Sequence, residues 1–134
     1  AVDTQHGLMV PKIRDVNKKK IDKISQELKD ISEKCRKLKI DKKEFFGGSM
    51  TISSLGGIGG TFFTPIINPP EVAILGVGKS FDKLVKDKNK IISRKILPIS
   101  LSYDHRIIDG AEGARFCVYL GKCLGKDFAF KLAV

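Results

Sequence analysis

The sequence predicts an α/β protein in which helices and strands pack as an α/β or α+β sandwich. Apolar residues recur at helical spacing over residues 17–38 and again over residues 111–124. Between these segments, residues 49–54, 71–77 and 90–103 form apolar or alternating runs that are typical of strands. A chain of 134 residues is long enough to form one domain with a core of its own.

The first 14 residues predict two extended segments around the turn-prone Gln5-His6-Gly7, with Pro11 at an edge or an end. His6 at such a turn is most simply a surface histidine. We assign it no chemistry.

A helix is predicted over residues 17–38, with Asp15 or Asn17 as its N-terminal cap. Its apolar residues recur at alternating steps of three and four and form one stripe: Ile21, Ile24, Leu28, Ile31, Cys35 and Leu38. The stripe spans too few heptads to favour a coiled coil, so packing on a sheet is the better interpretation.

A linker over residues 41–44 leads to a strand over residues 49–54, which runs into the glycine-rich residues 56–60. These glycines lack the order Gly-x-Gly-x-x-Gly and a Gly-Lys-Ser/Thr ending, and no helical pattern follows them. A phosphate-binding loop is therefore improbable. The glycines instead permit tight backbone conformations or close subunit approach, and residues 61–65 lead into another extended piece.

The stiff corner Asn68-Pro69-Pro70 precedes a buried apolar strand over residues 71–77. Polar residues 86–90 indicate a hairpin-like connection to the next strand, residues 90–103. The closing helix, residues 111–124, follows Asp109, a plausible N-terminal cap. Its expected apolar face consists of Ala114, Cys117, Val118, Gly121 and Leu124.

One of the two histidines, His105, comes directly after the strand that ends at residue 103. A histidine at a strand end beside a turn is held stiffly and stays reachable, as a general base must be. By itself the pattern of His105 and Asp109, four positions apart, is weak, and a structural histidine is the alternative.

The formal net charge of +10 raises nucleic acid, an acidic membrane surface or a polyanionic cofactor as partners. The lysines are scattered, however, no aromatic residues interleave with them, and tryptophan is absent. A solvated face is the better interpretation, and no nucleic-acid partner is expected. No apolar run has the length that crosses a bilayer, so no membrane is expected either.

The three cysteines, Cys35, Cys117 and Cys123, cannot all pair with one another, and none forms a Cys-x-x-Cys unit. We expect them to stay reduced inside a cell as small apolar fillers. His6 and His105 are far apart in the sequence, so no metal site is expected.

Residues 104–110, Asp-His-Arg-Ile-Ile-Asp-Gly, resemble the active-site signature Asp-His-Arg-x-x-Asp-Gly of the dihydrolipoamide acyltransferases. These proteins are the core components of 2-oxo acid dehydrogenase complexes. Residues 47–56 resemble the family's Gly-Gly-x-x-Thr-Ile-Ser block, and residues 65–76 its Pro-Ile-Ile-Asn-x-Pro block. The blocks come in the family's order, and the resemblance runs over nearly all of the chain. It implies a mixed β-sheet flanked by helices, similar to chloramphenicol acetyltransferase but incomplete here.

The resemblance also implies a chemistry. His105 matches the base that deprotonates the thiol of coenzyme A or, in reverse, of dihydrolipoamide, a task that suits an imidazole pKa near working pH. Ser53 matches the serine whose hydroxyl stabilises the oxyanion, with Ser54 as the fallback candidate. Asp109 matches an acidic or amide position that holds the local turn. Asp104 and Arg106 would brace the loop that orients His105.

The family forms homotrimers whose active site lies between two subunits, so His105 and Ser53 would act on one substrate from different chains. The trimers assemble into a larger core with other components of a 2-oxo acid dehydrogenase complex. Coenzyme A is a substrate, and lipoamide is carried on a lipoyl domain absent from this chain. The residues that contact coenzyme A are not predicted. The apolar tail, residues 127–134, would dock on a neighbouring subunit or pack on its own domain.

The flanking residues resemble the acetyl-transferring members of pyruvate dehydrogenase complexes more than the succinyl or branched-chain members. The family's catalytic domain is longer than this chain, so residues 1–134 are expected to be its carboxyl-terminal part. The expected compartment is the bacterial cytoplasm or the mitochondrial matrix. A scaffold fragment without activity and a basic nucleic-acid binder are the rival interpretations.

Overall fold

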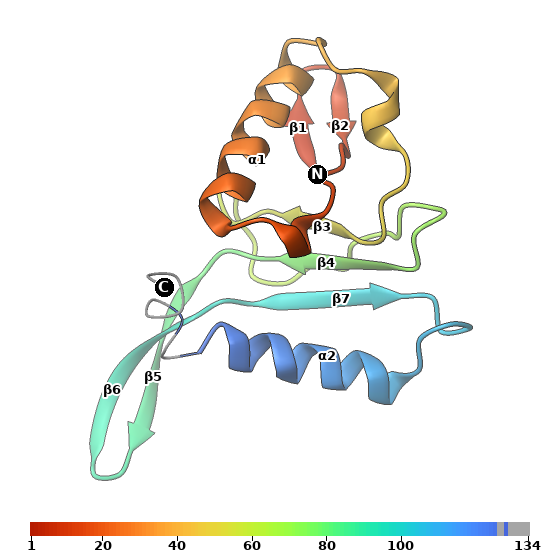
Figure 1. Ribbon diagram of the computed structural model, residues 1–134. Coiled ribbons are helices and arrows are strands. Elements are labelled where there is room, and N and C mark those ends of the chain that lie inside the picture. The colour runs from red at the N-terminus through yellow and green to blue at the C-terminus, as the bar shows by residue number, and fades with distance from the viewer. Residues whose placement is uncertain (126–127, 129–134) are drawn as a thin grey trace. The chain divides into compact units, whose positions relative to one another are not determined.

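The computed structural model describes residues 1–125 and residue 128 (Figure 1). The elements in chain order are β1 (Val2–Thr4), β2 (Gly7–Met9), η1 (Val16–Lys18), α1 (Ile21–Arg36), η2 (Lys42–Phe45), β3 (Thr51–Ser54), β4 (Ala73–Val77), β5 (Phe81–Asp87), β6 (Lys90–Ile96), β7 (Ile99–Tyr103) and α2 (Gly110–Cys123), where η marks a 3₁₀-helix. The chain divides into two compact units. Unit 1 contains residues 1–49 and the chain from residue 108 onward, and unit 2 contains residues 50–107.

Unit 1 begins with the hairpin of β1 and β2, which pair antiparallel with Val2 opposite Met9. Thr4 Oγ1 donates to the carbonyl oxygen of Gly7 at 2.7 Å and accepts from the backbone N–H of His6 at 3.1 Å. Gly7 has a φ of +103°, which favours glycine. The two predicted extended segments are confirmed, and His6 is exposed, as expected.

Helix α1 begins later than predicted, and the prediction of its cap is wrong. Residues Val16–Lys18 form a separate 3₁₀ turn, and Lys20 precedes α1 without a side-chain cap bond. Asp15 takes the left-handed conformation at the start of that turn, and its carboxylate binds Lys18 Nζ at 3.1 Å. The carboxylate is therefore paired with a neighbouring lysine instead of with the first amides of α1.

The apolar stripe of α1 is covered unevenly. Cys35 is fully buried, and burial raises the pKa of its thiol. Ile24 and Ile31 are half-buried, whereas Ile21 and Leu28 keep more than half of their surface exposed. The expectation of a packed stripe is met fully at Cys35 and partly at Ile24 and Ile31, and it is wrong at Ile21, Leu28 and Leu38, which are exposed.

The predicted linker at residues 41–44 is also a 3₁₀-helix. Asp41 caps it by accepting from the backbone N–H of Lys43 at 3.0 Å. Arg14 holds this segment in place, because its guanidinium donates to the carbonyl oxygens of Lys43 and Phe46 at 2.8 and 2.9 Å. The sequence predicted as a linker is therefore a helix that is stabilised by Arg14, a residue about thirty positions earlier in the chain.

Helix α2 is confirmed, with its first residue one position earlier than predicted. Its least exposed residues are Gly113, Cys117, Leu120 and Cys123, whereas Ala114 and Val118 are exposed. The predicted apolar face is therefore right at Cys117 and wrong at its neighbours. The predicted apolar tail, apart from residue 128, lies outside the described residues. Within the residues that are described, no helix is long and apolar enough to cross a membrane.

Unit 2 is organised around a three-stranded mixed sheet in the order β3-β4-β7 (Figure 1). Strand β3 runs parallel to β4, with Ser53 opposite Gly76, and β7 runs antiparallel to β4, with Ser100 opposite Gly76. The central strand β4 is buried over Ala73–Gly76, which confirms the predicted buried strand. The sequence of a central strand that is covered on both faces is typically a continuous run of apolar residues, and β4 has such a run.

The single strand predicted over residues 90–103 is wrong. Residues 90–96 form β6, which pairs with β5 in a separate hairpin, and residues 99–103 form β7 in the mixed sheet. Pro98 separates the two because its nitrogen has no hydrogen to give to a ladder. Its carbonyl oxygen accepts from the N–H of Gly78 at 3.0 Å. Strand β5 was not anticipated as a strand, because lysines and acids dominate its sequence.

The glycine-rich loop after β3 is a tight turn, as predicted. The N–H groups of Ile58 and Gly59 both donate to the carbonyl oxygen of Leu55 at 2.9 Å. Gly60 has a φ of +82°, and its carbonyl oxygen accepts from the N–H of Lys79 at 2.8 Å. The following residues 61–68 contain no assigned strand, so the predicted extended piece does not join a sheet.

Close backbone approach makes Gly78 irreplaceable in unit 2. A Cβ built on Gly78 would lie 2.0 Å from the carbonyl oxygen of Thr61, whereas one on Gly57 would meet nothing within 4 Å. Gly78→Ala is therefore expected to lower the free energy of unfolding by about 2 kcal/mol or more, since neighbouring backbone must move. Gly57→Ala, the matched control, should leave it within about 0.5 kcal/mol. Urea unfolding measures both, and equal midpoints for the two variants would contradict the close approach.

Candidate active site

The residue singled out as a base lies in a turn built directly on the end of β7. The N–H of Asp104 donates to the carbonyl oxygen of Val72 at 2.8 Å, which extends the ladder with β4 by one step. The N–H of Ile107 then donates to the carbonyl oxygen of Asp104 at 3.0 Å and closes a turn around His105. His105 is exposed. The sheet therefore fixes the backbone of the turn while the imidazole remains accessible to a substrate.

Asp104 and Arg106 clamp this turn, as the sequence predicted. The Asp104 carboxylate accepts from the backbone N–H of Arg106 at 3.0 Å and from its guanidinium at 2.6–3.2 Å. These hydrogen bonds lower the pKa of Asp104 to about 2 and raise the pKa of Arg106. The Arg106 side chain is exposed and that of Asp104 is half-buried, so the pair contributes little to global stability. Its effect is local, because it restricts the turn that carries His105.

The ring of Tyr103 lies beside the imidazole of His105, a contact that is not predicted from the sequence. The ring centroids of Tyr103 and His105 are 5.9 Å apart, with the planes tilted by 35°. The signal was available, because residues two positions apart at a strand end lie on the same face. Tyr103 thus limits the positions of the His105 ring from one side.

Ser53 and Ser54 face opposite sides of β3, as strand alternation requires. Ser53 is half-buried and shares its face with the buried Thr51. Ser54 is exposed, and its Oγ accepts from the N–H of Gly56 at 3.4 Å, a contact at the start of the glycine-rich loop. Of the two serines, Ser54 belongs to the turn and Ser53 is available to another partner.

Ser53 and His105 do not meet within one chain. Ser53 lies opposite Gly76 across one ladder, and Tyr103 lies opposite Ala73 across the other. With strands about 4.8 Å apart and a rise of about 3.3 Å per residue, Tyr103 is roughly 14 Å from Ser53, and His105, which lies beyond it, is roughly 15 Å away or more. Neither side chain is long enough to close that distance. A single unit 2 therefore cannot place both groups on one reacting carbon.

Asp109 caps helix α2. Its Oδ1 accepts from the backbone N–H of Glu112 at 2.8 Å, and its carbonyl oxygen accepts from the N–H of Gly113 at 3.0 Å. The carboxylate therefore satisfies an amide that the helix leaves without a partner, and its charge opposes the positive end of the helix dipole. The predicted cap is confirmed.

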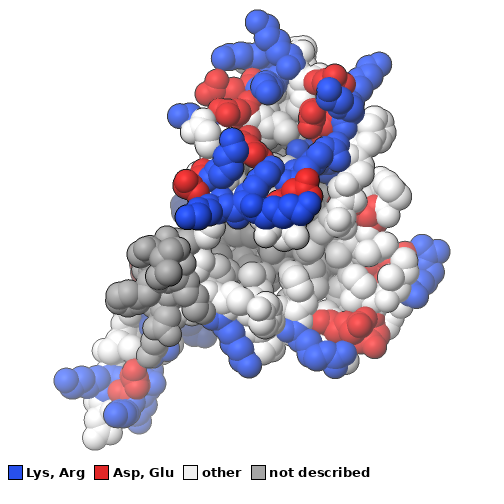
Figure 2. Space-filling model, in the orientation of Figure 1, with Lys and Arg blue, Asp and Glu red and all other residues white. Residues whose placement is uncertain are grey.

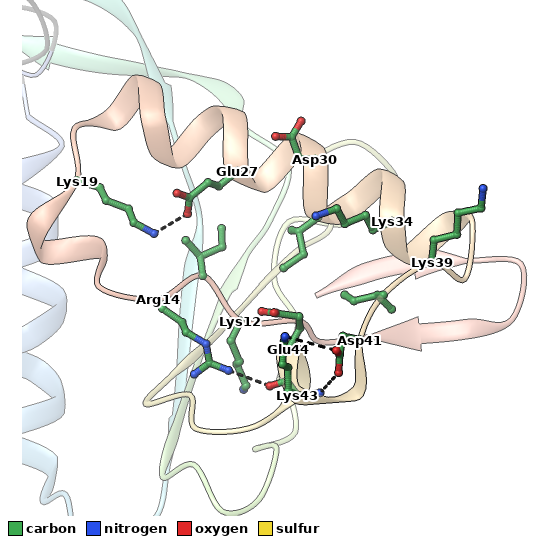
Figure 3. A pocket seen from close by; sticks show the side chains of 13 residues that line it. Lys12, Arg14, Lys19, Glu27, Asp30, Lys34, Lys39, Asp41, Lys43 and Glu44 are labelled. Atoms are coloured by element: carbon green, nitrogen blue, oxygen red, sulfur yellow. Dashed lines mark hydrogen bonds and ion pairs between the residues drawn. The ribbon is translucent and has the colours of Figure 1, made fainter.

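Unit 1 contains a cavity of about 490 Å³ (Figure 3). It is lined by Lys12, Ile13, Arg14, Lys19, Glu27, Asp30, Ile31, Lys34, Lys39, Ile40, Asp41, Lys43 and Glu44. Opposite charges pair within it, with Lys19 Nζ 2.6 Å from Glu27 and Lys43 Nζ 3.5 Å from Asp41. Figure 2 shows the same mixture of signs on the surface of this unit. None of the lining residues is a histidine, serine or cysteine, the residue types expected for this acyl transfer; the ionisable groups in the lining are carboxylates, lysines and one arginine.

The Asp104 carboxyl is expected to titrate near pH 2 in the folded protein. Its pKa is lowered from 3.8 in the folded state, so its stabilisation of the turn is complete above about pH 4. That stabilisation is lost as the pH falls through about 2. NMR titration of the side-chain carboxyl measures this value. Arg106→Gln should return the pKa toward 3.8, whereas Arg94→Gln, which removes an exposed partner of Asp87, should not.

Asp109 gives a second test. Asp109→Ala should lower the free energy of unfolding by about 1 kcal/mol through loss of the cap, while Asp109→Asn should retain most of it, because asparagine caps nearly as well. Urea unfolding followed by circular dichroism compares the two. Equal losses in the alanine and asparagine variants would show that the charge, and not the cap, stabilises α2.

The sequence profile of the 2-oxoacid dehydrogenases acyltransferase (catalytic domain) family matches residues 1–129. The dihydrolipoyllysine-residue acetyltransferase component of the pyruvate dehydrogenase complex of Haemophilus influenzae is 56% identical over 92% of this chain. The corresponding component of Cupriavidus necator is 53% identical over 96% of it. The chain spans 22% and 23% of these two relatives.

Two solved structures share the fold. One is from a crystallographic and enzymatic study of a serine, a histidine and an asparagine in the catalytic mechanism of Azotobacter vinelandii dihydrolipoamide acetyltransferase. It has a TM-score of 0.91 and 48% identity, and the match covers 96% of this chain and 53% of that chain. The other, the cubic core of a pyruvate dehydrogenase multienzyme complex, has a TM-score of 0.91, 49% identity and the same coverages.

These matches confirm the fold class predicted from the sequence, a mixed sheet with helices as in the acyltransferase cores. The match of the family profile covers nearly the whole chain, including the turn of His105 and the strand of Ser53. The chain belongs to the 2-oxoacid dehydrogenase acyltransferase family, as part of its catalytic domain.

Proposed function

We propose that the chain supplies the catalytic groups for acetyl transfer between coenzyme A and dihydrolipoamide in the core of a pyruvate dehydrogenase complex. The spacing of three residues carries the proposal. In the Azotobacter vinelandii enzyme the serine and the histidine named for the mechanism are 52 positions apart, and the asparagine follows the histidine by four. Ser53, His105 and Asp109 have the same separations. This match supports Ser53 over its neighbour Ser54.

His105 acts as the base. Its neutral imidazole takes the proton from the thiol of coenzyme A, and the resulting thiolate attacks the acetyl carbonyl of S-acetyldihydrolipoamide. When the tetrahedral intermediate collapses, the C–S bond to the lipoyl sulfur breaks and the imidazolium returns its proton to that sulfur. The products are acetyl coenzyme A and dihydrolipoamide. The reverse direction uses the same groups.

Ser53 acts as the oxyanion donor. Its hydroxyl donates a hydrogen bond to the negative oxygen of the tetrahedral intermediate, an interaction worth about 2.7–4 kcal/mol of barrier in comparable sites. The half-buried position of Ser53 favours this role, because a hydrogen bond to developing charge is stronger where water is partly excluded.

Asp109 holds the end of the catalytic turn. The relative has an asparagine at the corresponding spacing, and aspartate and asparagine are nearly equivalent as helix caps. The exchange therefore preserves the hydrogen bond to the first turn of α2 and changes the charge. We assign Asp109 a positioning role.

Each active site takes residues from two chains. The separation of roughly 15 Å between Ser53 and His105 within a chain requires a second copy to supply one of them. A cyclic homotrimer meets this need, because each subunit gives His105 to one site and Ser53 to the next. Trimers of this kind would build the larger core, together with the other components of the complex.

The remaining assignments follow from the same proposal. Residues 1–134 form the carboxyl-terminal part of the catalytic domain, consistent with coverage of 53% of the solved core chains. Lipoamide reaches the site on a lipoyl domain outside these residues. The relatives reported above are bacterial, which favours the bacterial cytoplasm over the mitochondrial matrix.

Single variants in the full-length polypeptide that contains this chain test both roles. His105→Ala is expected to lower kcat by about 10²–10⁴-fold. Ser53→Ala should lower it by about 10²–10³-fold, and Ser54→Ala should leave it nearly unchanged. Chromatography of the S-acetyldihydrolipoamide formed from acetyl coenzyme A measures the rate. Full turnover in assembled His105→Ala protein would refute the proposal.

Co-assembly of the two inactive variants tests the shared site. In mixed trimers of His105→Ala and Ser53→Ala subunits, about one site in four receives both intact groups if neighbours share each site. About a quarter of the wild-type activity should therefore reappear. If each chain completed its own site, mixing would restore none.

A further inference from the structure

We infer that Thr51 and Glu71 are positioning residues for acyl transfer, and that the hydrogen bond between them holds the strand of Ser53 in register with the turn of His105. The inference rests on the proposed function. Thr51 Oγ1 donates to Glu71 Oε2 at 2.5 Å. The bond joins residues that are 20 positions apart in the sequence.

Burial distinguishes this pair from the other polar groups. Thr51 and Glu71 are 4% and 7% exposed, and they are the buried polar or charged residues among those that the structure describes. A buried carboxylate is costly unless hydrogen bonds satisfy it, so the bond from Thr51 contributes to keeping Glu71 in place. Most charged residues of the chain lie at the surface, where solubility explains them.

On one side the bond fixes β3. Thr51 and Ser53 lie on the same face of this strand, two positions apart. The strand has four residues and, among the residues that the structure describes, pairs with β4 alone, so the ladder restrains it along one edge. A side-chain bond from the same face as Ser53 restricts rotation of the strand about its axis. That rotation would swing the Ser53 hydroxyl away from its target.

On the other side the bond leads to the turn of His105. Glu71 adjoins Val72, whose carbonyl oxygen accepts from the N–H of Asp104 at 2.8 Å. The backbone N–H of Glu71 donates to the carbonyl oxygen of Asn68 at 3.0 Å, which fixes the start of β4. One covalent step and one hydrogen bond therefore separate Glu71 from the residue that clamps the turn. A displacement of Glu71 moves the anchor on which the turn is built.

A single bond thus positions both catalytic groups of one chain, although these groups serve different active sites. We assign neither Thr51 nor Glu71 a contact with the substrate. Loss of the bond is therefore expected to lower kcat through misplacement of Ser53 and His105, while the KM for coenzyme A stays nearly constant. A misplacement of about 1 Å is enough to cost up to about 10²-fold in rate.

The test uses three variants of the full-length, assembled polypeptide. Thr51→Val keeps the shape and removes the hydroxyl, and it should lower kcat about 10-fold or more with KM within about twofold. Thr51→Ser keeps the hydroxyl and should recover most of the lost activity. Glu71→Gln keeps an acceptor without the charge and should lower kcat by at least about threefold, since charge-assisted bonds are roughly twice as strong as neutral ones.

Ile74→Val provides the control. It lies in the buried strand β4 and should lower the midpoint of urea unfolding without changing kcat. Wild-type kcat in assembled Thr51→Val would overturn the inference. If that variant does not assemble, Glu71→Gln decides, and its unchanged kcat overturns the inference equally. The proposed function fails separately, if His105→Ala retains turnover.

Discussion

The backbone ladders of β4 are the constraint on which the candidate site depends. β4 pairs with β3 along one edge and with β7 along the other, so it sets the positions of both strands that lead to the proposed catalytic groups. Its opposite orientations toward the two neighbours have a geometric consequence. Ser53 is carried toward one end of β4 and His105 toward the other. The topology that fixes each group accurately also keeps the two apart within a chain.

Under the proposed function, this separation makes assembly a condition of catalysis. A base and an oxyanion donor must act on one carbon, and side chains of histidine and serine cannot span roughly 15 Å. A second chain must therefore supply one of the groups. Under this proposal, subunit association does more than build a scaffold, because it completes the reaction centre. The elements at the ends of β4 consequently matter to two sites at once.

The sequence predicted the elements with a strong local signal and missed those fixed by distant contacts. The apolar run of β4, the cap Asp109 and the brace between Asp104 and Arg106 each depend on neighbours within a few positions, and each was confirmed. The predicted cap of α1, Asp15, is not observed, because the carboxylate of Asp15 pairs with Lys18 instead.

The misses share a physical origin. The strand predicted over residues 90–103 was divided by Pro98, and β5 acquires its pairing from β6 although its own sequence is rich in charges. The bond between Thr51 and Glu71 crosses 20 positions, so no local pattern could reveal it. The roles of His105 and Ser53 came from motif resemblance, because one histidine and one serine carry no specific signal in isolation.

The charged groups have different effects in the two units. In unit 1 the excess of lysine is interspersed with acids, and the charges in its cavity are paired: Lys19 and Glu27 are half-buried, whereas Lys43 and Asp41 are exposed, where an ion pair contributes little. In unit 2 two acidic residues bind segments next to the proposed catalytic groups: Asp104 closes the turn of His105, and Glu71 accepts a hydrogen bond from Thr51 in the strand of Ser53. Net charge therefore says little about this chemistry. What matters is whether an acidic side chain binds the backbone segment that carries a reacting side chain. Such a contact contributes little to stability, but it fixes the position of the reacting group.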